Sequence, residues 1–119
     1  LYHGLAHEIG HGLGIGGWTY GAARPMIVAD TANGTINVTA FTGPQAAAAW
    51  QGLGGSGYAP TQVGQPGPAS HWSRAGGLCG ELMEPTVRLH SRLSVVTLAA
   101  LADLGWTVRL DRAEPYARS

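Results

Sequence analysis

The chain of 119 residues has one cysteine, and only 12% of its residues are charged. The lone Cys79 cannot form a disulfide within this segment, so cysteine usage leaves the redox compartment open. Seven Lys and Arg balance seven Asp and Glu, which gives no positive field for gathering nucleic acid. No apolar run approaches the roughly 18 residues that span a bilayer, so we expect no membrane span in this segment. Function must therefore come from a local site.

Glycine and proline are abundant, with 19 and 7 residues respectively. Such a composition predicts many turns, and the chain length fits one domain. We expect an α+β chain made mainly of helices and ordered loops, with little strand. The surface is rich in small residues rather than in Lys and Glu, which is common in secreted proteins.

The N-terminal segment has helical periodicity. Leu5, Ile9 and Leu13 fall at four-residue steps, which predicts a helix over about residues 2–13 that ends at Gly14. The chain begins inside this helix without a starting Met or a cap. We therefore interpret it as the C-terminal part of a longer domain.

The C-terminal part contains the clearest helix signal. Ser94 is a good N-cap for a helix over about residues 94–104, and Gly105 can end it. Residues 106–110 are expected to form a short strand or an extended segment packed on that helix.

Residues 18–70 are irregular, and we expect an ordered insertion there. Within it the patterns favour short strands at 26–29 and 35–39, a short helix after Pro44 through residue 50, and a proline-containing loop over 59–70.

The chemistry of the sequence lies in the run His7-Glu8-Ile9-Gly10-His11. Side chains four residues apart lie on one face of a helix, so His7 and His11 can direct their imidazoles at one metal ion. Glu8 lies on the adjacent flank, where a general base can reach a water without binding the metal. Zinc with neutral imidazole ligands and an open position lowers the pKa of water to about 7. Glu8 would then take the proton, and a peptide carbonyl would be attacked.

Two other interpretations of this run need weighing. Five residues can match by accident on an ordinary helix surface, but the following glycines and a possible third ligand favour a metal site. His3 lies on the same face, yet His3 to His11 extends about 12 Å along the axis, too far for one ion. We therefore expect His3 to be a neighbour of the site.

The third ligand has several candidates. His71 ranks first because it lies in an ordered, tryptophan-containing loop. Carboxylates rank second, with Glu81, Glu84 and Asp103 as the choices, and His90 ranks last. From the residues alone these alternatives stay open.

The pattern resembles that of metzincin peptidases, specifically the leishmanolysin-like zinc metallopeptidases. Gly14 matches the metzincin glycine, but position 17 is glycine where the short pattern has its third histidine, which points to the subgroup with a long insertion. The resemblance covers most of the chain and rests on these segments: His7 to Gly14, Phe41-Thr42-Gly43-Pro44, His71-Trp72, Glu81-Leu82-Met83, Leu93-Ser94 and Asp103-Leu104-Gly105-Trp106.

The resemblance implies a zinc-dependent endopeptidase acting on protein or peptide substrates. His71 would complete the ligand set after the insertion, and Met83 would form the methionine turn within a third-ligand region over residues 71–85. Residues 1–119 would then be a partial catalytic domain without its upstream half, so this segment alone need not be active. An extracellular or cell-surface location is expected, although this segment contains no signal.

Two alternatives to a peptidase are a structural zinc-binding module and an inactive homologue. Glu8 discriminates them, because a structural site needs no carboxylate beside an open coordination position. Two sequons begin at Asn33 and Asn37 and would matter only in a eukaryotic secretory pathway. Family members tend to be rich in disulfides, so Cys79 either has a partner outside this segment or belongs to a less cross-linked relative.

Overall fold

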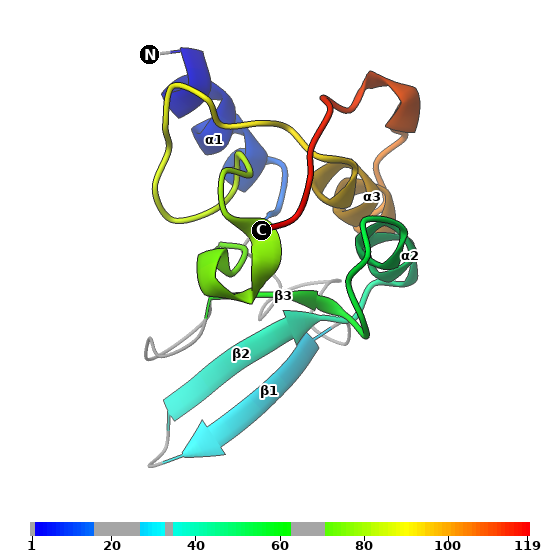
Figure 1. The fold of residues 1–119 in the computed structure, drawn as a ribbon. Coiled ribbons are helices and arrows are strands. Elements are labelled where there is room, and N and C mark those ends of the chain that lie inside the picture. The colour runs from blue at the N-terminus through cyan, green and yellow to red at the C-terminus, as the bar shows by residue number, and fades with distance from the viewer. Residues whose placement is uncertain (1, 16–26, 33–34, 63–70) are drawn as a thin grey trace.

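The computed structural model describes residues 2–15, 27–32, 35–62 and 71–119 (Figure 1). These residues form an α+β arrangement in which a three-stranded antiparallel sheet accompanies three α-helices and two short helical turns. The expected fold class is confirmed at this level. Among the described residues, no helix has both the length and the apolar character that crossing a bilayer requires.

Helix α1 spans Tyr2–Gly12 and agrees with the expected bounds. Gly14 follows with φ +118°, a conformation that L side chains rarely adopt, so glycine suits the end of this helix. An apolar stripe on a helix usually faces the core, but Leu5 and Ile9 are 63% and 54% exposed. The buried face of α1 consists instead of His7 and Gly10.

Strands β1 (Ile27–Ala32) and β2 (Thr35–Phe41) pair in antiparallel register, with an irregularity after Val28. The hairpin projects from the rest of the molecule (Figure 1). Both strands run further than the short segments expected from the sequence. A third strand, β3 (Ala59–Pro60), pairs with the end of β2, so the prediction that a loop begins at residue 59 is wrong.

Helices α2 (Pro44–Gly52) and α3 (Val95–Asp103) pack against each other. The hydroxyl of Ser94 accepts a hydrogen bond from the amide of Val96 at 3.2 Å, which confirms Ser94 as the N-cap of α3. Gly105 follows α3 with φ +103°. Both ends of α3 are therefore close to where the sequence places them.

Asp103, at the end of α3, caps the start of α2. Its carboxylate accepts hydrogen bonds from the amides of Gln45 and Ala46 at 3.0 and 2.8 Å. These amides belong to the first turn of α2, which lacks partners within its own helix. Gly43 permits the approach, because a Cβ at this position would lie 2.3 Å from Asp103 Oδ2.

Two short helical turns complete the fold. A kinked helical turn over Arg74–Leu78, with Gly77 outside helical φ/ψ, lies between His71 and Met83, and Leu110–Arg112 forms a 3-10 turn. No strand forms over residues 106–110, so the strand alternative for that segment is wrong. The indole of Trp106 instead donates a hydrogen bond to Leu13 O at 2.8 Å, which ties the end of α3 to the end of α1.

One hydrophobic core joins these elements. Trp72 and Phe41 are fully buried, with ring centroids 6.2 Å apart, and Leu78 and Met83 are buried with them. The sheet, α1, α3 and the 71–84 segment thus share an interior. A candidate site that draws on α1 and residue 71 lies at the surface of that core.

Candidate metal centre

His7 and His11 present the same nitrogen toward each other. His7 Nδ1 lies 2.7 Å from Leu82 O, and His11 Nδ1 lies 2.7 Å from Ile15 O. A carbonyl can only accept, so both Nδ1 atoms carry the proton and both Nε2 atoms keep a lone pair in the neutral rings. Each ring is therefore held in the tautomer that suits metal binding through Nε2.

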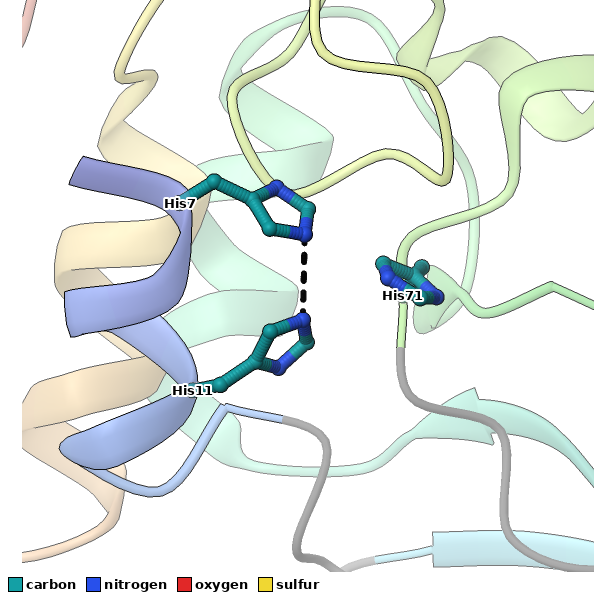
Figure 2. Close-up of side chains that lie close together, drawn as sticks. All are labelled: His7, His11 and His71. Atoms are coloured by element: carbon teal, nitrogen blue, oxygen red, sulfur yellow. Dashed lines mark hydrogen bonds between the residues drawn. The ribbon is translucent and has the colours of Figure 1, made fainter. Parts of the chain in front are cut away.

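The two Nε2 atoms are 3.1 Å apart (Figure 2). Two neutral imidazoles cannot hydrogen bond through two lone pairs, so this contact is favourable when either a proton or a metal ion lies between the nitrogens. Zinc at ~2.05 Å from two nitrogens in tetrahedral geometry separates them by about 3.3 Å. The observed spacing on α1 is close to that value.

His71 faces the pair from a different part of the chain (Figure 2). Its ring centroid lies 5.2 Å from that of His7 and 5.0 Å from that of His11. One ligand nitrogen from each of the three rings can be chosen so that all lie within 4.8 Å of one another. Among the described residues this is the group whose donors converge as a metal requires.

The backbone around His71 lies beside the residues that follow β3, outside the three-stranded sheet. Gln62 N donates to His71 O at 2.9 Å, and Trp72 N donates to Met83 O at 3.0 Å. Thr61, which follows β3, forms a bridge with Trp72. The backbone at residues 71 and 72 is thus hydrogen-bonded to two separate segments, one at Gln62 and one at Met83.

The imidazole of His71 is half-buried and strongly disfavours a positive charge. Burial lowers its pKa to about 4, with the neighbouring His11 and His7 acting in the same direction and Glu8 opposing them. Its Nδ1 atom is buried and has no hydrogen-bond partner among the described residues. A neutral ring with an unsatisfied buried nitrogen is suited to binding a metal.

Glu8 lies at the exposed side of the site. Its carboxylate raises the pKa of His71, so its charge acts on the third ring from the flank of α1. The side chain is solvent-exposed. It is therefore not buried in a structural ion pair.

Met83 packs against α1 at Gly10. It is fully buried, and a Cβ added to Gly10 would meet its sulfur at 2.6 Å. Gly10 lies between His7 and His11 in the helix, so the thioether packs directly against the segment that carries both rings. The role of Met83 as a methionine turn stays a prediction.

Two of the carboxylates weighed as ligands are fully buried away from the histidine group. Glu81 accepts hydrogen bonds from Ser94 and Thr97. Glu84 Oε2 accepts from Gly80 N at 2.9 Å, and its Oε1 lies 3.4 Å from Arg88 Nε. Neither joins the converging donors.

The remaining alternatives are also placed elsewhere. Asp103 caps α2, and His90 is exposed and lies outside the group. His3 contacts Tyr2 and likewise does not converge on the other rings. Of the third-ligand candidates, His71 alone has the geometry for the role among the residues that the structure describes.

Cys79 is a free, half-buried thiol within this chain. Its carbonyl accepts a hydrogen bond from the hydroxyl of Tyr116 at 2.7 Å. Asn33 lies outside the described residues, and Asn37 lies in β2, where its backbone pairs with Asp30.

Sequence reasoning missed the carbonyls that orient the rings. Leu82 O and Ile15 O are backbone atoms, and nothing in residue type distinguishes them. The one sequence signal for these carbonyls is their place beside motif residues, since Leu82 precedes Met83 and Ile15 follows Gly14.

Comparisons of the chain with protein-family models, curated proteins and solved structures gave no match. The likeness to metallopeptidases consequently rests on the motif residues and on the geometry described above.

Proposed function

We propose that this chain is the metal-binding part of a zinc-dependent endopeptidase. The main support is the convergence of His7, His11 and His71, with the two Nε2 atoms on α1 at 3.1 Å. Structural zinc sites use four protein ligands, whereas catalytic sites use three and leave a position for water. The group here contains three donors from the residues that the structure describes.

Each residue has a distinct role in this proposal. Zinc, when bound by the three histidines, would supply a Lewis acid that polarises a peptide carbonyl and lowers the pKa of water to about 7. Glu8 would accept a proton from the attacking water and pass it to the leaving amine. Met83 would support the rings from below without binding the metal.

The finer assignment follows from the same residues. We propose that residues 1–119 form the C-terminal part of a metzincin-like catalytic domain, with a preceding part of the protein holding the extended substrate. The exposed apolar residues Leu5 and Ile9 on α1 are consistent with a covering segment. An extracellular or cell-surface location belongs to the same proposal.

Substitution of Glu8 by Gln in the full-length protein tests the proposal. The variant should retain zinc at wild-type stoichiometry and lose at least ~100-fold in peptide hydrolysis, because the amide cannot accept the proton. Zinc content by elemental analysis and cleavage of an unfolded protein substrate are the two measurements. Unchanged hydrolysis would remove Glu8 from the mechanism, and wild-type protein without zinc would contradict the proposal itself.

A further inference from the structure

Glu81 is a fully buried carboxylate that the proposed reaction does not use. Its Oε1 accepts a hydrogen bond from Met83 N. Its Oε2 accepts from Ser94 N at 3.0 Å and from the hydroxyls of Ser94 and Thr97, both at 2.6 Å. Four donors from two parts of the chain thus converge on one side chain.

Burial raises the pKa of Glu81, and the hydrogen bonds from Met83, Ser94 and Thr97 oppose that rise. A buried carboxyl group is costly unless its oxygens are satisfied. Here both oxygens are satisfied, and the donors are spaced around them. The arrangement specifies where the donors lie relative to one another.

Through Thr97 the network reaches the residue beside the third histidine. The indole of Trp72 donates to Thr97 Oγ1 at 2.9 Å, and the same hydroxyl donates to Glu81. A hydroxyl has one proton, so the hydrogen bonds run in one direction, from Trp72 through Thr97 to Glu81. Trp72 is fully buried and directly follows His71.

On the other side the network reaches the atom that orients His7. The carboxylate of Glu81 accepts a hydrogen bond from the amide of Met83, and Leu82 lies between these two residues. The carbonyl of Leu82 contacts His7 Nδ1 at 2.7 Å. Met83 O in turn accepts from Trp72 N at 3.0 Å. The carbonyl that contacts His7 and the tryptophan that follows His71 are thus both connected by hydrogen bonds and short backbone to the carboxylate of Glu81.

We infer that Glu81 is a positioning residue, which sets His7 through the Leu82 carbonyl and His71 through the Thr97–Trp72 pair in the geometry that zinc requires. The inference rests on the proposed zinc site. Hydrogen-bond partners behind metal ligands typically change metal affinity about 10- to 100-fold when they are removed.

The test measures metal binding in the full-length protein rather than turnover. Glu81→Gln keeps the shape of the side chain but replaces one of its two oxygens with an NH2 group. That group cannot accept a hydrogen bond from the donors that face it. Its zinc Kd should rise about 10- to 100-fold, and the visible absorption of the cobalt(II)-substituted protein should shift as the ligand field changes. Glu84→Gln is the matched control, because Glu84 is equally buried in the same segment but its side chain contacts Gly80 N and Arg88 instead of Met83, Ser94 or Thr97.

A second pair of variants guards against failure of Glu81→Gln to fold. Thr97→Val removes the hydroxyl between Trp72 and Glu81, whereas Thr97→Ser retains it. Weaker zinc binding and an altered cobalt spectrum in the valine variant, with recovery in the serine variant, are expected.

The outcomes separate the two proposals. Wild-type protein that binds neither zinc nor cobalt contradicts the proposed function. If Glu81→Gln binds zinc with the wild-type Kd and gives the wild-type cobalt spectrum, only the positioning role is overturned. If that variant does not fold, the same result for Thr97→Val overturns it.

Discussion

The sulfur of Met83 lies directly against Gly10, where the absence of a side chain on α1 makes room for it. A Cβ at residue 10 would lie 2.6 Å from the sulfur and 2.9 Å from the terminal methyl of Met83. Both distances are shorter than real Cβ contacts allow. With Met83 placed as it is, only a residue without a Cβ fits between it and α1 at this position. Gly10 also lies between His7 and His11, so a shift here would move the backbone that carries both rings.

Gly10→Ala should therefore move Met83 and weaken the site. We expect a loss of about 1 to 2 kcal/mol in the free energy of unfolding relative to Gly4→Ala, together with weaker zinc binding. Gly4 is the control because a Cβ there meets nothing within 4 Å, so alanine should stabilise α1. Urea unfolding of both variants checks the difference, and equal stabilities would show that the end of the Met83 side chain shifts to admit the Cβ without cost.

His71→Ala should sharply lower the zinc content of the full-length protein. The substitution leaves His7 and His11 as two ligands, and two imidazoles hold zinc much less tightly than three. His90→Ala provides the control, because His90 is exposed and lies outside the converging group. Elemental analysis after dialysis measures both, and full zinc retention without residue 71 would assign the third ligand elsewhere.

Asp103→Asn should destabilise the fold by about 1 kcal/mol without changing zinc affinity. The carboxylate accepts from the amides of Gln45 and Ala46 at the start of α2, where negative charge is also favoured, and asparagine has only one accepting oxygen. Asp111→Asn is the control, because its ion pair with Arg109 is exposed and should contribute little. Chemical denaturation compares the two, and a zinc-linked effect of Asp103 would contradict its role as a cap.

The metal-free protein should lose stability as the pH falls from 6.5 toward 4. Burial and the neighbouring His11 and His7 lower the pKa of His71 to about 4, while Glu8 opposes this shift. In that pH range the unfolded chain binds a proton at residue 71 and the folded chain does not, so the unfolded state gains stability on acidification. Urea midpoints across the range should show a smaller pH dependence in His71→Gln, and an identical dependence would rule out this contribution.

The sequence predicts the parts of the fold and site that depend on local spacing. His7 and His11 converge because they are one helical turn apart, and Ser94 caps α3 through an amide two residues away. Gly14 ends α1 for an equally local reason. Each of these features is determined within a few residues of chain.

The remaining features depend on contacts between distant segments, which the pattern does not report. Asp103 caps a helix that begins far upstream, and strand β3 has only two residues, one of them Pro60. Glu81 carries no sign in the sequence of being buried, since charged residues are usually exposed. The kinked helical turn after Trp72 includes Gly77 at φ 123°, and glycines are too common in this chain for one to stand out.

The three histidines come from two separate parts of the molecule, the helix α1 and the segment that bridges to Thr61 beside β3. An ion bound by both parts would bind the folded chain and not the unfolded one, so it would raise the free energy of unfolding as its concentration increases above the Kd. Amides at the junction, such as those of Gln62 and Trp72, would exchange with solvent more slowly once the ion is in place.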